Sequence, residues 1–564
     1  MSKIKIGLLI DDLNLSEINS DLVYWMSKNQ DIIIDLLIIN DLNKGFISKI
    51  ISTYNKYSLI RILEIIIFKL IFNFEKLIYL IFLTKYKFEK INLSELGIRR
   101  IVTTPKVSNK SFDFYYSSEV IKEVKKHNLD FIIRMGSGII KGDILNSTKY
   151  GILSFHHADN DINRGGPAGF WEVYLKQSES GFIIQKLNEV LDGGNVIKKG
   201  FFPTKSFFYL NQIYLYKKSN FYFKKLILYI IQNNSLPVSS PSKNFKGKIY
   251  KTPNLLETFK YIKNTYFFII KKVFKKFLFE KDIWYIAYQK KNFNQFDQYN
   301  MKYIQNRPNC FNADPFLYKF KNENYLFVEN YNFKKKRGNI SSYILKHDEY
   351  NFLGDVLSED FHLSFPYIFT FENKIYMCPE THQAKEIRLY ECINFPLTWK
   401  YKKTLMYDVD AADTMIFKHN DLWWLFSNID YSNINDHSSE LSIFYSLEGP
   451  ITSNWKSHKS NPIIVDCKKA RNAGIIFSNE KIYRVNQKPG FNLYGKEFEI
   501  NLIQKLDKDN FCEQAMLKIK PDFYKKIIGT HHMSSNDEYT VIDCCKKNFF
   551  NINTGLETKN NQSN

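Results

Sequence analysis

The stretch from 154 to 173 concentrates side chains that suit acid–base chemistry on a small polar substrate. Two adjacent histidines, His156 and His157, precede an Arg-Gly-Gly-Pro turn that begins at Arg164, and Asp192 follows in a glycine-rich turn. A histidine paired with a carboxylate is a good general base, because the carboxylate selects its tautomer and stabilises the imidazolium. The alternative is a buried polar network of the two histidines and Asp159 that performs no chemistry.

A second set of polar side chains recurs in the C-terminal half, at matched places in repeated apolar strands. Carboxylates that face one another suit glycosidic cleavage as an acid and base pair, and with interleaved aromatics they equally suit plain sugar binding. A third alternative is that the aspartates only cap strands. We expect the following set to converge at one centre: Asp314, Glu329, His362, Glu380, Asp413 and Arg471.

Continuous apolar runs that alternate with helical spacing indicate the elements that hold the first set. Ile4–Ile10, Ile32–Ile39, Asp130–Met135 and Gly151–Phe155 predict buried strands, and Ser117–Asn128 predicts a helix. This alternation is typical of a Rossmann-like α/β layer with a mostly parallel sheet, whose carboxyl edge binds ligands. No Gly-x-Gly-x-x-Gly follows the first strand, so a nicotinamide dinucleotide site is not expected.

From Asp282 onward the pattern changes to short strands that repeat. Four units each contain a strand, a polar turn and a second strand that ends in a polar side chain: 314–329, 365–380, 413–428 and 473–486. Repeats of this length predict an all-β five-bladed propeller. We expect the fifth blade to join Asp282–Tyr288 with Glu497–Leu506, because pairing the two ends of the ring removes its sheet edges.

The N-terminal motif resembles that of the folate-dependent formyltransferases, over about Ile4–Thr204. The matching run is Phe155-His-His-Ala-Asp-Asn-Asp-Ile-Asn-Arg-Gly-Gly-Pro-Ala-Gly-Phe-Trp171-Glu-Val, followed by Leu191-Asp-Gly-Gly. The resemblance implies that His156 and Asp192 are catalytic. The asparagine of the family falls on Ser154, so that Ser154, His157 or a backbone N–H would support the oxyanion.

The same resemblance implies acyl transfer without a metal. Its donor is 10-formyltetrahydrofolate and its acceptor is an amino sugar or sugar nucleotide. The implied substrate- and cofactor-binding residues are His157, Asp159, Asn160, Arg164, Gly165 and Trp171.

The C-terminal half, over about 282–540, resembles the propeller of arabinanase- and xylosidase-like glycosidases. It is closer to the propeller of plant glucosamine inositolphosphorylceramide transferases, through Ala313-Asp-Pro-Phe-Leu, His362-Leu-Ser-Phe-Pro, Pro379-Glu380, Ala412-Asp413-Thr, Trp423-Trp-Leu-Phe and Ala470-Arg-Asn-Ala-Gly. The resemblance implies a carbohydrate site. The remaining histidines stand alone in the sequence, and we expect surface or structural roles for them: His347, His419, His437, His458, His531 and His532.

The chain has 564 residues and a net charge of 79 − 58 = +21. Residues 217–290 hold 16 Lys, no Arg and three acidic residues, so 16 − 3 = +13 of this charge is local. A lysine-rich connector without arginine argues against nucleic-acid recognition and leaves contact with an anionic membrane open. We predict a formyltransferase-like domain (1–235), a basic linker with a helix (236–281), the propeller (282–545) and a polar tail (546–564).

Charged residues interrupt the apolar stretch Ser58–Leu83, which predicts amphipathic helices packed on the domain rather than a membrane span. The alternative for this stretch is a surface helix that touches lipid. The odd number of cysteines, without Cys-x-x-Cys, favours a cytoplasmic protein, with membrane association left open.

Three other functions stay open at this stage. The propeller would be a glycosidase or transglycosidase beside a catalytically degenerate N-terminal domain, the protein would only recognise glycans, or it would be a methionyl-tRNA formyltransferase.

Overall fold

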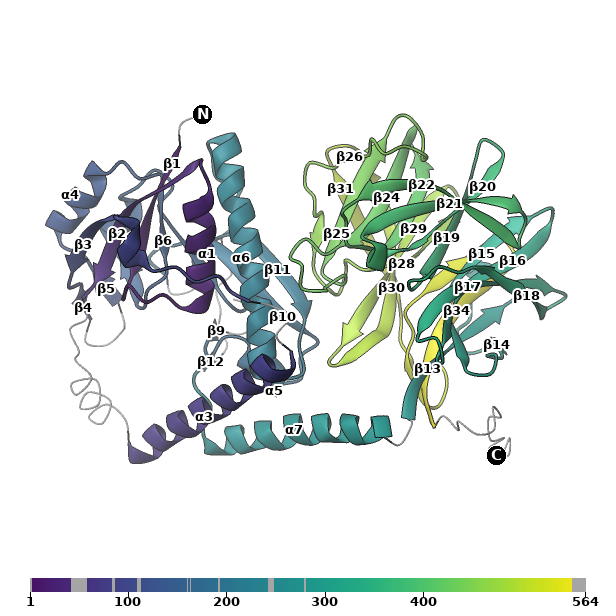
Figure 1. Ribbon diagram of the computed structural model, residues 1–564, viewed down its shortest axis with the longest axis horizontal. Coiled ribbons are helices and arrows are strands. Elements are labelled where there is room, and N and C mark those ends of the chain that lie inside the picture. Colours follow the sequence, from purple (N-terminus) through teal and green to yellow (C-terminus); the bar gives the residue numbers. More distant parts are fainter. Residues whose placement is uncertain are drawn as a thin grey trace. The chain divides into compact units, whose positions relative to one another are not determined.

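The computed structural model describes residues 3–41, 58–83, 87–108, 113–159, 161–162, 164–190, 193–241, 248–277 and 280–549. The chain divides into two compact units, Met1–Phe267 and Phe268–Asn564. The first is built of helices and a largely parallel sheet, and the second is all-β (Figure 1).

A seven-stranded sheet forms the centre of the first unit, in the order β11-β10-β8-β6-β1-β2-β3. The strands from β8 to β3 are parallel, and β10 and β11 extend the sheet as an antiparallel edge. This confirms the predicted mostly parallel sheet. The bounds are β1 Ile4–Ile10, β2 Ile32–Asn40, β3 Arg99–Thr103, β6 Phe131–Arg134, β8 Ile152–His156, β10 Glu179–Lys186 and β11 Asn195–Pro203.

Helices cover both faces of this sheet. On one face Phe223 of α6 contacts Phe155 of β8, with 4.5 Å between the ring centroids. On the other face Val124 of α4 shares a core cluster with Leu9 and Ile152. The helices are α1 Glu17–Lys28, α3 Leu59–Phe82, α4 Ser118–Lys126, α5 Phe170–Tyr174, α6 Phe208–Asn233 and α7 Leu255–Phe277.

Two small sheets complete the first unit. β9 (Arg164–Gly165) pairs in parallel with β12 (Ile249–Tyr250). A three-stranded sheet contains β4 (Lys106–Val107), β5 (Asp113–Tyr115) and β7 (Ile139–Lys141).

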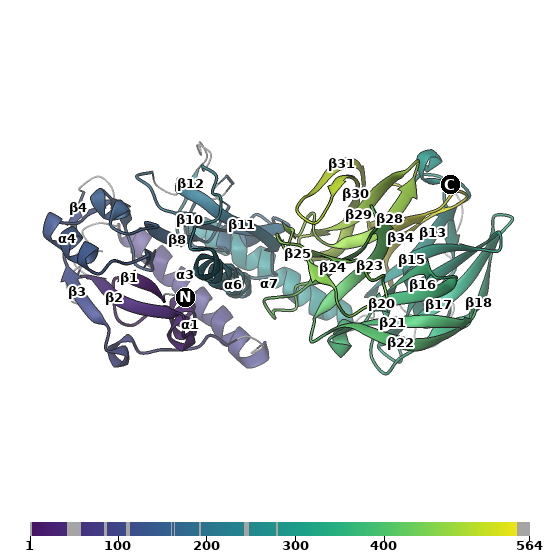
Figure 2. The same ribbon diagram turned by 90° about the horizontal axis from the view of Figure 1, so that it is seen from above.

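The second unit is a five-bladed propeller, and in its first, second and fourth blades the strands follow one another across the sheet in chain order (Figure 2). The predicted repeat units form the two inner strands of the first four blades. The strands of these blades are β15 Cys310–Phe320, β16 Glu323–Asn332, β17 Arg337–Lys346 and β18 Glu349–Leu357; β19 Ser364–Phe371, β20 Lys374–Glu380, β21 Glu386–Asn394 and β22 Thr398–Tyr407; β23 Ala411–His419, β24 Leu422–Ile429, β25 Glu440–Ser446, β26 Lys456–Ser457 and β27 Ile464–Val465; β28 Asn472–Ser478, β29 Lys481–Gly490, β30 Leu493–Leu506 and β31 Phe511–Ile519.

The fifth blade closes the ring differently from the prediction. β13 (Glu280–Gln289) pairs antiparallel with β34 (Thr540–Phe549) along its whole length. The predicted partner Glu497–Leu506 is wrong, because it belongs to β30 inside the fourth blade. A pattern of buried residues predicts that a segment is a strand, but it does not predict the strand with which that segment pairs. The pairing depends on how many strands come before the segment in the ring. The other strands of this blade are β14 Lys302–Ile304, β32 Ile527–Gly529 and β33 Met533–Ser535.

The innermost strands of four blades share one backbone irregularity. Each has a bulge, and Asp314, Phe365, Asp413 and Gly474 there have positive φ angles of 48°, 47°, 51° and 121°. Such bulges re-aim a side chain, and the left-handed conformation is costly for a residue other than glycine. At Gly474 a Cβ would lie 2.1 Å from the carbonyl oxygen of Met533, so only glycine fits. The backbone therefore presents Asp314 and Asp413 at matched positions.

Candidate functional site

In the first unit, a row of polar side chains crosses the sheet near its carboxyl edge. Ser154 of β8 lies opposite Arg134 of β6 and Gln185 of β10, so the three share one face. His156 is two residues farther along β8 and points to that same face, because side chains alternate along a strand. Gln185 is buried, and its Oε1 has no hydrogen-bond partner. The row thus offers a histidine and an unused acceptor, and sequence reasoning missed Gln185.

Further polar groups follow the ends of the neighbouring parallel strands. Asp11, just after β1, accepts hydrogen bonds from Asn40 Nδ2 (3.0 Å) and from the backbone N–H of Ser137 (2.6 Å). The hydroxyl of Tyr116 donates to Asn40 Oδ1 over 2.8 Å. Burial raises the pKa of Tyr116, which keeps its proton on the phenol. This edge of the sheet is therefore polar and ordered, as expected of a ligand-binding edge.

The two residues expected to support an oxyanion do not both face His156. The hydroxyl of Ser154 donates to the carbonyl oxygen of Phe155 over 3.1 Å. His157 points to the opposite face, where it stacks on Phe155 and meets Tyr216 of α6 edge-on. Burial and the nearby His156 lower the pKa of His157 to about 3, so its ring is neutral. His157 thus packs under α6 rather than beside the row.

Asp159 is buried and paired. It lies 2.5 Å from Lys199 Nζ, which also contacts Asp161 at 2.8 Å. Burial lowers the pKa of Lys199, but the two carboxylates outweigh this effect and raise it. Asp159 is therefore committed to an ion pair that ties the loop after β8 to β11. The predicted residues Asn160 and Asp192 lie outside the described residues.

The Arg-Gly turn forms as the sequence indicates. Arg164 is buried, and Gly165 (φ 98°) approaches Tyr250 so closely that a Cβ would lie 2.0 Å from the carbonyl oxygen of Tyr250. The ring of Trp171 packs against that of Tyr250 in a tilted arrangement, with 4.6 Å between the ring centroids, and its indole N–H donates to the carbonyl oxygen of Gly166. These contacts hold the turn rigidly, and only glycine fits at position 165.

In the propeller, the predicted residues come together in buried ion pairs. Arg471 Nε donates to Asp413 Oδ2 over 2.6 Å, and its Nη2 lies 3.8 Å from Glu380 Oε2. Glu380 Oε1 in turn contacts His382 Nδ1 at 2.8 Å. The guanidinium also lies over the ring of Tyr494, 5.0 Å from its centroid. One arginine thus bridges acidic residues from two blades.

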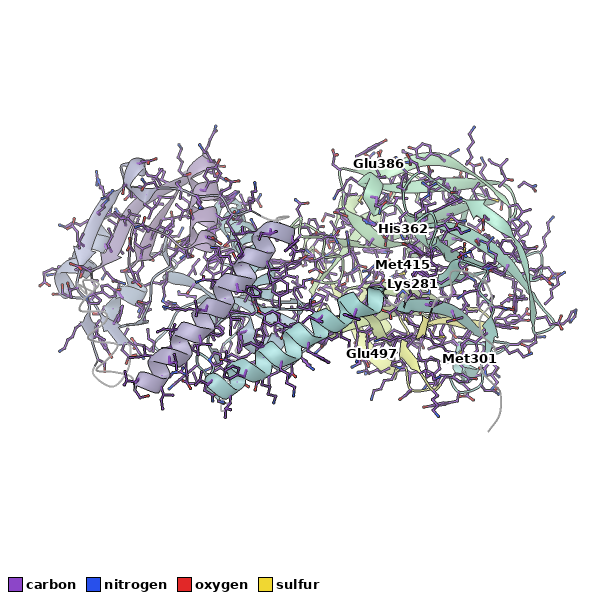
Figure 3. The ribbon with its side chains drawn as sticks, turned by 60° about the horizontal axis from the view of Figure 1, so that its bottom comes forward. Lys281, Met301, His362, Glu386, Met415 and Glu497 are labelled. Atoms are coloured by element: carbon purple, nitrogen blue, oxygen red, sulfur yellow. The ribbon has the colours of Figure 1, made fainter. Side chains whose placement is uncertain are left out.

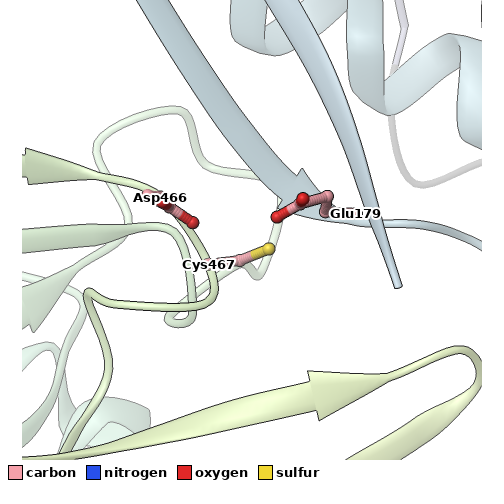
Figure 4. Close-up of side chains that lie close together, drawn as sticks. All are labelled: Glu179, Asp466 and Cys467. Atoms are coloured by element: carbon pink, nitrogen blue, oxygen red, sulfur yellow. The ribbon is translucent and has the colours of Figure 1, made fainter. Parts of the chain in front are cut away.

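The turn before β28 orients this arginine. The backbone carbonyl of Asp466 accepts from the N–H groups of Lys469 and Ala470, and its side chain accepts from the N–H of Lys468. Figure 4 shows Asp466 and Cys467 in this turn. Because Arg471 follows directly, the turn sets the direction from which its side chain reaches Asp413.

A second charged group joins the first blade to the fifth. His531 Nε2 lies 3.1 Å from Asp314 Oδ1, and its Nδ1 lies 2.8 Å from Asp543 Oδ2. Burial lowers the pKa of His531, but the two carboxylates outweigh it and raise the pKa to about 10. The three side chains lie close enough to hold a metal ion. Without a metal, the His531 imidazolium supplies the positive charge between the two carboxylates, and a metal ion would have to displace its proton.

Carboxyl groups in this centre have pKa values pushed in opposite directions. Burial and the charges of Asp314 and Glu380 raise the pKa of Glu329 well above its ordinary value. Burial raises the pKa of Asp314, but His531 outweighs it and keeps that pKa below the ordinary value. Burial raises the pKa of Asp413 to about 8 against the effect of Arg471. A protonated Glu329 and an ionised Asp314 are a suitable acid and base.

His362 completes the predicted set. Its Nε2 lies 3.5 Å from Glu329 Oε1, and its Nδ1 accepts from the backbone N–H of Gly338. Figure 3 labels His362 in the propeller. Burial lowers the pKa of His362. With Nδ1 as an acceptor, the Nε2–H points to Glu329.

Two of the histidines for which surface or structural roles were expected pair with carboxylates, which is a structural role. His531 bridges Asp314 and Asp543, and His437 Nε2 contacts Asp410 Oδ1 at 2.7 Å. The signal for His531 was its place before the last strand, which is informative only once β33 is known to be innermost in its blade. Tyr494 was missed for a similar reason, since it lies at the start of β30, outside the two inner strands of its blade.

We expect the propeller to lose stability as pH rises from 6.5 to about 10. The folded state holds the proton of His531 with a pKa of about 10, whereas the ordinary value is 6.5. This stabilisation is therefore complete below pH 6.5 and is lost towards pH 10, by up to about 1.4 kcal/mol per pH unit. Urea denaturation between pH 6.5 and 9.5 measures it. His531→Gln should flatten the slope and His347→Gln should not; a slope unchanged in His531→Gln contradicts the assignment.

Comparisons with known proteins connect the propeller to one family of transferases. Residues 300–527 match the family model of the N-terminal region of glucosamine inositolphosphorylceramide transferase 1. The rice (Oryza sativa subsp. japonica) protein of that name is 37% identical over 213 residues, which are 36% of this chain and 28% of that protein. The chain thus spans under a third of the length of this curated relative.

Solved structures are similar to parts of the chain at low identity. The family 117 glycoside hydrolase Zg3597 of Zobellia galactanivorans covers 47% of this chain and 91% of its own, at 10% identity and a TM-score of 0.31. Glycinamide ribonucleotide transformylase 1 of Symbiobacterium toebii covers 42% and 93%, at 11% identity and a TM-score of 0.28. We assign the architecture of both units from the strand pairing described above and not from these similarities.

Proposed function

We propose that the first unit transfers a formyl group to the amine of an amino sugar or sugar nucleotide and that the propeller binds carbohydrate. The observation that carries the proposal is the position of His156 at the carboxyl edge of the parallel sheet, inside the predicted motif and on the face of the polar row. 10-Formyltetrahydrofolate would supply the formyl group. The unused Oε1 of Gln185 fits such a ligand, because both a pteridine and an amine present N–H donors.

The residues of the chain have distinct roles in this proposal. Neutral His156 accepts a proton from the attacking amine, which raises the nucleophilicity of its nitrogen. Asp192 orients the imidazole, as the family resemblance implies. Because Ser154 donates to Phe155, oxyanion support falls to a backbone N–H at the strand end.

The propeller supports the carbohydrate part of the proposal. Its buried acids, Arg471 and Tyr494 provide the hydrogen-bonding groups and the aromatic face on which sugars bind. The rice protein that matches this region is named a glucosamine inositolphosphorylceramide transferase.

Release of tetrahydrofolate from 10-formyltetrahydrofolate, followed with a panel of amino-sugar nucleotides, tests the proposal. We expect turnover with at least one amino sugar and none with the matching sugar that has a hydroxyl in place of the amine. No turnover on the whole panel, together with no thermal shift by 5-formyltetrahydrofolate, would refute it.

A second candidate function is cleavage of a glycosidic bond by the propeller. It is favoured by the opposite pKa directions of Glu329 and Asp314. In this case Glu329 protonates the leaving oxygen, and Asp314 activates water or attacks the sugar.

Glu329→Gln should then lower hydrolysis of aryl glycosides by about 10²–10⁴-fold, the contribution of a general acid. Glu323→Gln on the same strand β16 is the matched control, because Glu323 pairs with Lys346 away from the centre. Equal rates in the wild type and Glu329→Gln would exclude this role.

A further inference from the structure

The helix α3 is built with its polarity reversed relative to an ordinary surface helix. Its inward face carries two acids, Glu64 and Glu75, beside Phe68 and Tyr79. Its outward face carries large apolar side chains that are exposed to between 49% and 75%: Leu59, Ile60, Leu63, Ile66, Leu70, Phe74, Leu77, Leu80, Ile81 and Phe82. A surface helix of a soluble domain normally shows the opposite arrangement. The helix packs on the domain as predicted, through Phe68, Phe72 and Tyr79, but the apolar side chains named above face outward.

Specific hydrogen bonds fix this orientation. Glu75 is fully buried, and it accepts from the hydroxyls of Tyr261 and Tyr266 and from the backbone N–H of Tyr209. Burial raises the pKa of Glu75. At the other end of α3, Glu64 pairs with Arg61 and accepts from the N–H of Leu255. Turning the helix to bury its apolar face would break the contacts of Glu75 with α6 and α7 and that of Glu64 with Leu255, so the exposed face is a feature of the fold.

The start of α7 lies beside α3 and adds exposed aromatic and basic residues. Phe74 of α3 contacts Tyr266 of α7, with 6.0 Å between ring centroids, and Figure 3 shows the two helices side by side. The exposed residues of α7 within the first unit are Leu256, Phe259, Lys260, Lys263 and Phe267. We call these residues and the outward face of α3 the α3–α7 surface.

We propose that the α3–α7 surface docks on an anionic lipid membrane, with its apolar side chains in the headgroup–acyl boundary. The size of the exposed apolar face is typical of an interaction site. Its exposed charged residues are all cations: Lys69, Lys260 and Lys263. Lysines flanking an apolar helix face are the pattern of an interfacial helix on anionic lipid. A second copy would bring like charges together and fits less well.

The mode of contact is peripheral. Within the described part of the chain, no helix combines the length and the apolarity that crossing a bilayer requires. The sequence left lipid contact open for residues 217–290 and, as an alternative, for Ser58–Leu83; this proposal assigns it mainly to α3, with the start of α7 as its basic edge. The proposal is independent of what either unit catalyses.

Flotation of the full-length protein with vesicles of phosphatidylcholine, alone or mixed with phosphatidylserine, tests the docking. We expect binding to the mixed vesicles and much weaker binding to the neutral ones. The triple variant Leu63→Gln, Leu70→Gln and Leu77→Gln should bind about 10-fold more weakly for each leucine. Lys69→Gln, Lys260→Gln and Lys263→Gln together should weaken binding about fivefold per lysine, on mixed vesicles only.

The matched control replaces three exposed leucines of the propeller, Leu397, Leu447 and Leu517, with glutamine, and it should bind like the wild type. Undiminished binding by the α3 triple variant, or no vesicle binding by the wild type, overturns the proposal. Sedimentation of the wild type and all variants measures their oligomeric state, which is the second test. A dimer that the α3 substitutions dissociate would show that the surface joins two copies, and this too overturns the proposal.

Discussion

Replacing Asp543 with alanine should lower the free energy of unfolding of the propeller by about 3–5 kcal/mol, the cost of leaving a buried charge without its partner. Asp543 is fully buried and accepts from the backbone N–H groups of His531 (2.8 Å), His532 (3.0 Å) and Asp314 (3.3 Å). It also holds the His531 ring at 2.8 Å. The substitution leaves the three backbone N–H donors without their acceptor and removes one of the two carboxylates beside the His531 imidazolium. Urea denaturation followed by tryptophan fluorescence measures this, since Trp284 lies 4.2 Å from the ring of His531.

Two further variants separate this effect from ordinary surface changes. Asp537→Ala, in the turn before the same strand β34, removes an exposed ion pair with Lys319 and should cost no more than about 1 kcal/mol. Asp543→Asn keeps an acceptor for the backbone donors but removes the charge, so its effect should be intermediate. Equal stability of Asp543→Ala and Asp537→Ala would show that the Asp314–His531–Asp543 group does not hold the blades together.

Replacing His156 with alanine should lower kcat/KM for formyl transfer by about 10²–10⁴-fold, the usual contribution of a general base. His156 ends β8 on the face that carries Ser154 and Gln185, and no histidine of the opposite face can take its place. His157 is held there between Phe155 and Tyr216. Tetrahydrofolate release with the amino sugar identified in the panel is the readout.

The matched control is His127→Ala. His127 also pairs with a carboxylate, Asp35 at 2.7 Å, but it lies at the C-terminal end of α4, near the amino end of the sheet's strands. Its loss should leave the transfer rate within about twofold. If the His156 variant retains the wild-type rate, formyl transfer by this site is refuted and the glycosidic function of the propeller becomes the better candidate.

Local pattern was sufficient for most elements of both units. The run Ile4–Ile10 coincides with β1, because a strand buried on both faces must be apolar throughout. The helix predicted at Ser117–Asn128 runs from Ser118 to Lys126, with the Ser117 hydroxyl accepting from the N–H of Val120. In the propeller, each two-strand unit buries apolar side chains in the same pattern, so the repeat in the sequence identifies the blades.

The convergence of Asp413, Glu380 and Arg471 could also be predicted from the sequence. Matched positions in a closed ring of repeats face the same axis, so residues far apart in the chain meet there. What the repeat could not predict is the contribution of the fifth blade, because β13 and β34 come from opposite ends of the chain. His531 and Asp543 are therefore recognised as members of the centre only once β33 and β34 are placed in the ring.

By itself, the sequence determined the two kinds of fold, the place of His156 at a strand end and most of the acids in the propeller centre. These follow from periodicity, which acts over a few residues or repeats regularly. Only the tertiary structure decided which blade closes the ring, that His157 and His156 face apart, and that α3 turns its apolar face outward. Each of these depends on a partner distant in sequence, above all on the tyrosines that hold Glu75 on the inner side of α3.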